Sequence, residues 1–330
     1  MLPRIFVLAT GGTIAGITHT TDTTSYRSGI LNIGDLLTTV PSLKFFAHVE
    51  AEQIANIDSK DLTFRLWEIL VSRIQSLCAD DTIDGIVITH GTDTLEETAY
   101  ALHLILNEHK PIVLTAAMRP ATAISPDGPI NLLNAVIVAA NPASRGQGVL
   151  VSFNNRIHSA RDITKVSTYA IDAFESPEFG ALGYVQGGYV EFARNMTRVR
   201  PTENDTRLVM TNKWPVVDII TSYVGVSRIA IDALIKVGVG GIVVAGTGNG
   251  SIHITLQYVL ANAAKQGIAV VRTSRTGSGH VMRNGAVNDD ALHFISAGSL
   301  NPYKARILLM FGLANGITGS IALQKLFDKY

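Results

Sequence analysis

The chain has 330 residues, of which 47% are hydrophobic and 16% charged, and its 27 basic side chains balance its 27 acidic ones. This length and composition predict a well-folded protein of two domains. Without excess positive charge, neither nucleic acid nor an anionic membrane is an expected partner. Apolar runs such as 132–140 also fall short of the roughly 20 residues that a membrane span requires.

Strand and helix patterns alternate along most of the chain, as expected for β-α-β units and a mainly parallel sheet. The predicted strands cover residues 5–9, 85–89, 111–114, 148–153, 216–221, 241–245 and 269–272. The predicted helices cover residues 62–77, 95–106, 130–140, 229–236, 255–265 and 305–313. A polar stretch containing Pro201 interrupts this alternation. We therefore expect an N-terminal α/β domain at 1–193, a linker at 194–214 and a C-terminal α/β domain at 215–330.

Two apolar strand-like stretches run into the same loop pattern, Thr-x-Gly-Thr. The first is Thr10-Gly11-Gly12-Thr13, and the second is Thr89-His90-Gly91-Thr92, followed by Asp93. Ligands of open α/β sheets bind at the carboxyl ends of the strands, where both loops are expected. The pattern therefore predicts that Thr13 and Thr92 face one pocket.

The second loop leads into a predicted helix that begins near Asp93 or Thr94. Glu96 and Glu97 in its first turn complete a capping-box pattern. Asp93 can therefore act simply as a cap. Alternatively, Asp93 and Thr92 hold a polar substrate together with the exposed N–H groups of the helix start. We expect His90 to shape the turn.

A threonine hydroxyl is a poor nucleophile unless a neighbouring group assists it. One candidate helper is Tyr26, which follows a threonine-rich run at 18–25 that could close over the site and bring its phenol to Thr13. The alternative is a surface loop whose tyrosine merely packs. A second candidate is Lys165, since burial favours the neutral, basic form of a lysine side chain. The sequence alone does not bring Lys165 to Thr92.

Several other kinds of site lack their usual motifs. The sequence has no Gly-x-Ser-x-Gly elbow and no His-Glu-x-x-His helix, and Thr13 is internal, unlike the nucleophile of N-terminal threonine hydrolases. The glycines at 10–16 match neither the phosphate-loop nor the dinucleotide fingerprint. The single cysteine, Cys78, excludes an intrachain disulfide and is expected to pack in the core. Residues 1–4 do not resemble a secretory signal, so the expected location is the cytoplasm, or the periplasm if a signal has been removed.

Residues 7–16 and 88–94 resemble the two signature motifs of the bacterial L-asparaginase family, type II. The resemblance continues through 116–120, 127–129, 162–165, 246–251 and 299–302, and so covers essentially the whole chain. It implies a larger, flavodoxin-like N-terminal catalytic domain with a mixed, mainly parallel sheet. It also implies a smaller C-terminal α/β domain with a parallel sheet.

The resemblance implies hydrolysis of L-asparagine to aspartate and ammonia, with L-glutamine as a possible second substrate and no metal or organic cofactor. It makes Thr13 the nucleophile, Tyr26 its partner on a flexible lid, and Thr92, Asp93 and Lys165 a second catalytic cluster. The implied substrate-binding residues are Gly12, Ser59, Lys60, Gly91, Thr92, Asp93, Ala117 and Ser251. The implied assembly is a homotetramer whose sites are shared between subunits.

Two residues depart from the family pattern. Lys60 stands where Gln or Glu usually contacts the substrate ammonium, and Ala286 stands where a glutamate from a neighbouring subunit often sits. A lysine beside an ammonium is a repulsive contact. We therefore expect Lys60 to turn toward solvent or the substrate carboxylate, leaving Asp93 as the main ammonium partner. Asp289 or Asp290 could replace the missing glutamate.

Two other functions remain as alternatives to an amidohydrolase. One is a nucleotide-dependent enzyme that uses the glycine-rich stretch at 10–16 or at 246–250. The other is a catalytically silent amino-acid sensor, which the departures at Lys60 and Ala286 make conceivable.

Overall fold

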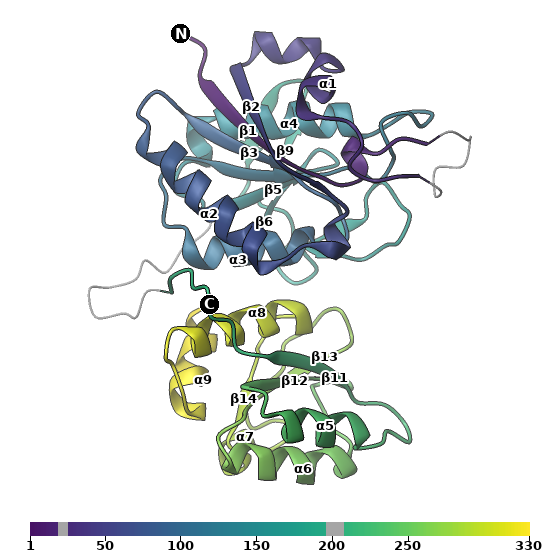
Figure 1. Ribbon diagram of the computed structural model, residues 1–330, viewed down its shortest axis with the longest axis vertical. Coiled ribbons are helices and arrows are strands. Elements are labelled where there is room, and N and C mark those ends of the chain that lie inside the picture. The colour runs from purple at the N-terminus through teal and green to yellow at the C-terminus, as the bar shows by residue number, and fades with distance from the viewer. Residues whose placement is uncertain (19–25, 196–207) are drawn as a thin grey trace. The chain divides into compact units, whose positions relative to one another are not determined.

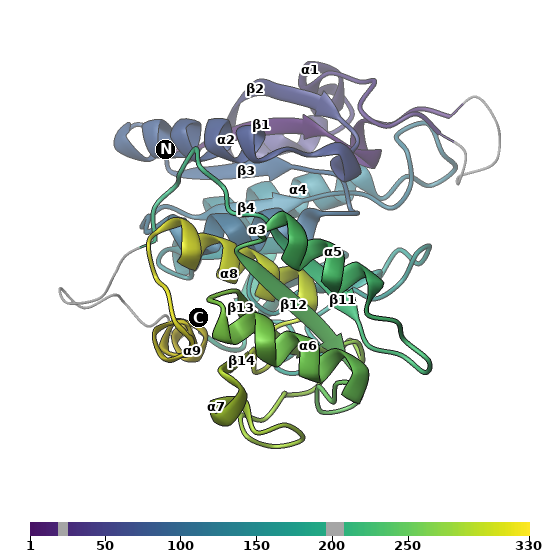
Figure 2. The same cartoon turned by 60° about the horizontal axis from the view of Figure 1, so that its bottom comes forward.

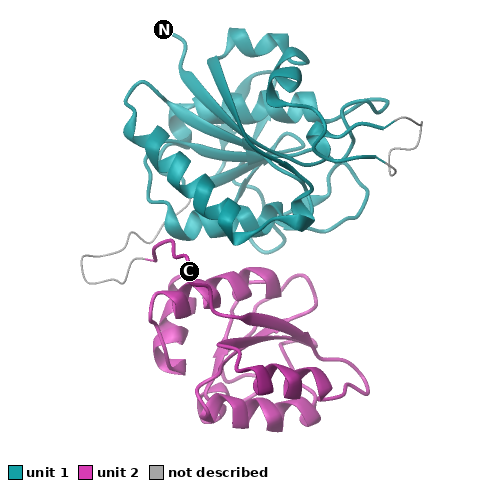
Figure 3. Cartoon of the chain, in the orientation of Figure 1, with its two compact units in different colours: residues 1–198 teal, residues 199–330 magenta. Residues whose placement is uncertain are grey.

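In the computed structural model, which describes residues 1–18, 26–195 and 208–330, the chain forms two compact units, Met1–Arg198 and Val199–Tyr330 (Figure 3). Over these described residues, the first unit holds an eight-stranded, mainly parallel sheet and the second a four-stranded parallel sheet. The predicted α/β fold is confirmed. Residues 196–207 of the proposed linker lie outside the described residues, so that assignment stays a prediction. No described helix has the length and apolar character needed to cross a membrane.

The large sheet has the strand order β10-β9-β6-β5-β4-β3-β1-β2. Its parallel strands are β1 (Arg4–Gly11), β2 (His48–Ile57), β3 (Gly85–Thr89), β4 (Ile112–Thr115) and β5 (Val149–Phe153). The antiparallel strands are β6 (Arg156–Ser159), β9 (Gly183–Gln186) and β10 (Tyr189–Phe192). A separate pair is formed by β7 (Thr164–Lys165) and β8 (Phe174–Glu175). The parallel strands follow the flavodoxin-like order 2-1-3-4-5.

Helices cover both faces of the large sheet (Figure 1). They are α1 (Ile33–Thr38), α2 (Phe64–Ala79), α3 (Leu95–Ile105) and α4 (Gly128–Ala140). Side chains alternate between the two faces along a strand. Ile5 and Val7 accordingly pack with Ala135 of α4, while α2 and α3 lie over the opposite face. The sheet is therefore buried on both sides, which explains why its central strands read as continuous apolar runs.

The small sheet has the order β11-β12-β13-β14, all parallel. Its strands are β11 (Val217–Thr221), β12 (Gly241–Gly246), β13 (Ala269–Ser274) and β14 (Phe294–Ser296). Its helices are α5 (Ile229–Val237), α6 (Ile254–Lys265), α7 (Asp289–Leu292), α8 (Pro302–Ala314) and α9 (Ser320–Lys329). Within this unit, α5 and α6 cover one face of the sheet and α8 the other (Figures 1 and 2).

All the predicted strands and helices form. The strands and helices absent from the prediction are the edge strands β2, β10 and β14, the strands β6 to β9, and the short helices α1, α7 and α9. The β2 strand is half-buried and alternates polar with apolar residues from His48 to Glu52, a period-2 signal that breaks at Gln53. The β9-β10 hairpin turns at Gly187 and Gly188, both with positive φ, which is the expected chemistry of a two-residue turn. Both signals were present in the sequence.

The strand order reverses between β1 and β3, and this switch point is where open α/β sheets bind ligands. The two strands are in register, with Ala9 beside Thr89, so the two threonine loops leave the sheet at the same level. The loops then touch through glycine backbone. A Cβ built on Gly12 would lie 2.4 Å from the Cα of Gly91. The residues directly before Thr13 and Thr92 are therefore in contact.

Replacement of Gly12 by alanine should strongly destabilise the first unit. Gly12 has φ 81° and ψ −171°, a region that is essentially restricted to glycine, and a methyl group there would overlap Gly91. We expect Gly12→Ala to lower the free energy of unfolding by roughly 2–6 kcal/mol, the sum of backbone strain and overpacking. The measurement is urea unfolding followed by the fluorescence of Trp67 in a Trp214→Phe background.

Gly146→Ala is the matched control, because Gly146 also has positive φ (73°) but nothing lies within 4 Å of its Cβ position. Strain alone should then cost roughly 1 kcal/mol. Equal losses in the two variants would contradict a tight contact between the loops.

In the second unit, a fully buried ion pair joins Arg272 on β13 to Asp289 at the start of α7. The guanidinium donates to both carboxylate oxygens, at 2.8 and 2.6 Å. It also donates to the carbonyl oxygens of Asn249 (2.7 Å) and Met282 (2.8 Å). This one side chain therefore ties the loop after β12 to the loop before α7.

Loss of the Asp289 charge should unfold the second unit more easily, because it leaves the Arg272 guanidinium buried without a counter-ion. We expect Asp289→Asn to cost about 3–5 kcal/mol. Urea unfolding followed by Trp214 fluorescence in a Trp67→Phe background reports on this unit. Asp232→Asn, which breaks an exposed ion pair, should leave the midpoint almost unchanged. Similar midpoints for the two variants would refute the prediction.

Candidate active site

The first threonine loop places the Thr13 hydroxyl beside a tyrosine. Thr13 is 4% exposed, and its Oγ1 lies 2.6 Å from the Oη of Tyr26. Tyr26 is positioned by the backbone pairing of Ile17 with Arg27, in which two N–H···O bonds of 3.0 Å form. Its ring also packs against Gly16. The structure thus brings Tyr26 to Thr13, whereas residues 19–25 of the expected lid lie outside the described residues.

The second threonine loop meets Lys165, which lies far away in sequence. Lys165 Nζ donates to Thr92 Oγ1 at 2.9 Å and forms an ion pair with Asp93 Oδ1 at 2.7 Å. The lysine comes from β7, whose pairing with β8 fixes its backbone. The Lys165 side chain is 18% exposed and that of Asp93 54%. A hydroxyl, an ammonium and a carboxylate therefore adjoin at the mouth of the second loop.

The threonine of the predicted capping box does not cap the helix. Thr94 occupies the N-cap position of α3, but its side chain makes no capping hydrogen bond. Its hydroxyl donates instead to the carbonyl oxygen of Ser59, at 2.8 Å. Asp93 lies outside the helix and pairs with Lys165. Thr94 and Asp93, which the local pattern assigns to the start of the helix, instead bind Ser59 and Lys165 on neighbouring segments.

Ser59 and Lys60 lie on a short 3-10 turn against the second loop. A Cβ on Gly91 would fall 2.5 Å from Ser59 Oγ, so the turn and the loop are packed closely. The Ser59 hydroxyl is buried, and among the described residues no group accepts from it or donates to it. Lys60 faces outward, 61% exposed, with its Nζ 2.5 Å from Asp61 and 3.8 Å from Asp58. On this turn, therefore, the Ser59 hydroxyl has no partner among the described residues, whereas the Lys60 ammonium is paired with carboxylates.

The loop after β4 carries Ala117, which is fully buried. The carboxylate of Asp127 accepts hydrogen bonds from the N–H groups of Met118 (2.9 Å) and Arg119 (2.8 Å). Asn131 Nδ2 donates to the Ala116 carbonyl at 3.0 Å. Neither Asp127 nor Asn131 was among the expected site residues. The usable signal was an Asp followed by Gly and Pro just before the predicted helix at 130–140, because α4 in fact begins at Gly128 with Asp127 at its N-cap.

Ser251 and Ala286 belong to the second unit. Ser251 closes a small turn with Thr247 through backbone bonds of 2.9 and 2.7 Å, and Ala286 is exposed. The suggestion that Asp289 replaces the missing glutamate is wrong, because both of its oxygens are bound by the buried Arg272. Asp290 is held by Arg283 and Asn284.

His90 is buried, and its Nδ1 lies 2.8 Å from the carbonyl oxygen of Gly91. Burial lowers the pKa of His90 from 6.5 to about 4, more than the bond to Gly91 raises it. The ring is therefore neutral near pH 7 and donates its Nδ1 proton to that carbonyl. Cys78 is half-buried, and burial raises the pKa of its thiol to about 12.

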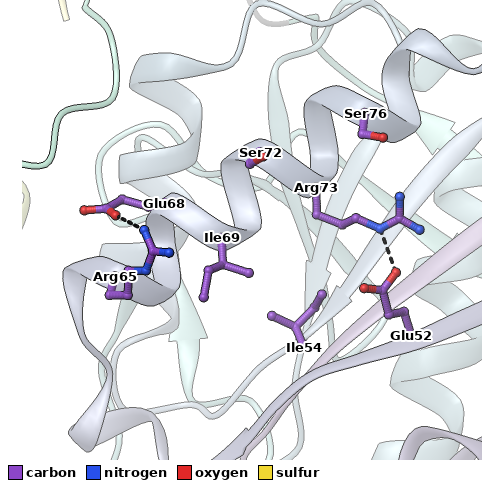
Figure 4. A pocket seen from close by; sticks show the side chains of 8 residues that line it. All are labelled: Glu52, Ile54, Arg65, Glu68, Ile69, Ser72, Arg73 and Ser76. Atoms are coloured by element: carbon purple, nitrogen blue, oxygen red, sulfur yellow. Dashed lines mark hydrogen bonds and ion pairs between the residues drawn. The ribbon is translucent and has the colours of Figure 1, made fainter.

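A cleft of about 440 Å³ also opens between β2 and α2 (Figure 4). It is lined by Glu52, Ile54, Arg65, Glu68, Ile69, Ser72, Arg73 and Ser76. Two ion pairs, Arg65 with Glu68 and Arg73 with Glu52, occupy its charged groups. None of these residues belongs to the threonine loops, so the cleft is separate from the candidate active site. Within residues 1–18, 26–195 and 208–330, no cluster of His, Cys, Asp or Glu could hold a metal ion.

Residues 4–198 match the family described as "Asparaginase, N-terminal", and residues 216–327 match the "Glutaminase/Asparaginase C-terminal domain". The chain is 41% identical to L-asparaginase 2 of Escherichia coli, over 100% of this chain and 94% of that protein. It is 39% identical to a glutaminase-asparaginase of Pseudomonas fluorescens, over 100% and 91%. The crystal structure of a probable cytoplasmic L-asparaginase from Campylobacter jejuni has a TM-score of 0.94 and 45% identity, covering 99% of this chain and 100% of that one.

These similarities confirm the resemblance carried by the two threonine loops, and they extend over both units. The chain therefore belongs to the asparaginase family of hydrolases.

Proposed function

We propose that the protein hydrolyses L-asparagine to L-aspartate and ammonia, with Thr13 as the nucleophile and L-glutamine as a secondary substrate. The observation that supports this proposal is the contact of the two threonine loops at the switch point of the large sheet, since each loop carries a hydroxyl cluster. One cluster is Thr13 with Tyr26, and the other is Thr92 with Asp93 and Lys165. The asparaginase and glutaminase-asparaginase names of the relatives support the choice of substrates.

In the proposed reaction, Thr13 Oγ1 attacks the side-chain amide carbon of asparagine. Tyr26 Oη, 2.6 Å away, accepts the proton that Thr13 loses while its own hydroxyl proton passes to the amide nitrogen. The tetrahedral intermediate collapses as the C–N bond breaks, and ammonia leaves with that proton. The remaining ester between aspartate and Thr13 is attacked by water, which releases L-aspartate and restores the hydroxyl.

The second cluster has a different role in this scheme. Lys165 donates to Thr92 Oγ1, so the Thr92 hydroxyl keeps its own proton for the substrate and is held in one orientation. Asp93 is more than half exposed and can accept from the α-ammonium of asparagine while it remains paired with Lys165. Ser59, whose buried hydroxyl is unpaired among the described residues, is positioned to donate to the α-carboxylate.

The family resemblance extends the proposal to a homotetramer, in which Ser251 of a neighbouring subunit completes each site. Size-exclusion chromatography coupled to light scattering measures that state directly. A monomer with full activity would contradict a shared site.

Thr13→Ala should lower kcat for ammonia release from asparagine by at least about 10³-fold, because it removes the attacking atom. Tyr26→Phe should lower kcat by roughly 10²–10⁴-fold, as expected for a group that takes part in proton transfer. Lys165→Met should also lower kcat, because it removes the donor that fixes the orientation of the Thr92 hydroxyl. Steady-state kinetics on asparagine and glutamine measure these effects. Thr92→Val keeps the shape of the second cluster without its hydroxyl and should also lower kcat.

Ammonia release and a thermal-shift measurement together distinguish the alternatives. A silent amino-acid sensor would bind asparagine without releasing ammonia, and a nucleotide-dependent enzyme would show a thermal shift with ATP or NAD. Full activity in Thr13→Ala would refute the assignment of the nucleophile.

Stability should fall in acid partly because of His90. Its folded-state pKa, about 4, lies below the ordinary 6.5, so only the unfolded chain gains its proton between these values. The contribution is fully present above pH 6.5 and is lost as the pH falls toward 4, amounting to about 3 kcal/mol. His90→Gln should remove this part of the slope in urea unfolding measured from pH 7 to 4. Identical slopes in the variant and the wild type would contradict the assignment.

A further inference from the structure

The backbone of Lys60 is held beside the candidate active site. Its side chain can still form ion pairs with more than one carboxylate. The 3-10 turn Ser59–Asp61 that carries it packs on Gly91 through Ser59. Thr94 Oγ1 holds the same turn by donating to the Ser59 carbonyl. The Lys60 ammonium therefore stays within reach of the charges around the second threonine loop.

Three carboxylates compete for Lys60. Asp61 binds its Nζ at 2.5 Å, and Asp58 lies 3.8 Å away. Asp93 is the third: it directly precedes Thr94, whose hydroxyl bonds the carbonyl of Ser59, the residue before Lys60. The hydrogen bond to Asp61 raises the pKa of Lys60 most, and the charges of Asp58, Asp61 and Asp93 raise it further, against desolvation. We call Asp58 and Asp61 the acid pair. If the Lys60 ammonium left the acid pair, the remaining carboxylate that could attract it would be that of Asp93. In the proposed function, Asp93 must be available to the substrate.

We propose that Asp58 and Asp61 restrain Lys60 from pairing with Asp93, and that this restraint sets the affinity of the site for substrates that carry an α-ammonium group. This inference rests on the proposed function. Lys60 competes with the substrate ammonium for one carboxylate, and the acid pair decides the competition. Lys165 does not enter it, because it is already bound to Thr92 and Asp93 on its own side of the loop.

The restraint predicts a change in binding that depends on the ligand. Asp61→Asn should raise the KM for asparagine and the competitive inhibition constant of L-aspartate by roughly two- to fivefold, the range expected for one exposed ion pair. Succinate, which is aspartate without its ammonium group, should bind equally well or better, because the freed Lys60 attracts its carboxylates. Lys60→Gln should lower the KM for asparagine. In each variant kcat should change less than KM.

The double variant Asp61→Asn/Lys60→Gln separates restraint of Lys60 from a direct effect of the Asp61 charge. Its KM should match that of Lys60→Gln alone. Glu50→Gln is the matched control, since it breaks an exposed pair with Arg4 near the amino end of the same sheet and should change neither constant.

Three results would overturn the inference while leaving asparagine hydrolysis intact. These are an unchanged KM in Asp61→Asn, an equal rise in the double variant, and a parallel loss of succinate binding, which would indicate a distorted turn. If the wild-type protein released no ammonia from asparagine, the proposed function and this inference would fail together.

Discussion

The contact between the Gly12 and Gly91 backbones is the constraint on which the candidate active site depends. Each glycine stands directly before a threonine, and neither position has room for a Cβ atom. Two parallel strands in register deliver both loops to this point, at the place where the strand order reverses. Main chain packs tightly against main chain here, and the Thr10 hydroxyl adds one bond between the loops by donating to the Thr89 carbonyl, so neither Thr13 nor Thr92 is needed to hold them together.

The two lysines near the second threonine loop differ in burial and in the partners of their ammonium groups. Lys165 is largely buried and engaged with Thr92 and Asp93, whereas Lys60 is exposed and engaged with Asp61. Two lysines near one carboxylate can therefore have opposite consequences. One orients the reacting groups, and the other must be kept away from the substrate ammonium, because like charges repel most strongly where water is partly excluded.

In the second unit, a single buried cation holds separate loop segments together. Arg272 holds the loop that precedes Ser251 and the segment that precedes Ala286, through carbonyl oxygens and the Asp289 carboxylate. A guanidinium has five donors in a rigid plane, so it can bridge several acceptors that a lysine could not. The two segments to which the family resemblance assigns a role in the site are thus braced by one residue whose own charge is fully paired.

The sequence by itself determined the central strands, the main helices, the two threonine loops and the family, because apolar runs, helical periodicity and glycine positions are local patterns. Only the tertiary structure decided which polar groups meet. Lys165 lies 73 positions from Thr92, Thr94 bonds to Ser59 instead of capping its helix, and Asp289 is taken by Arg272. A polar side chain has several partners of similar energy, and the one it binds is set by how distant segments pack, which no local pattern records.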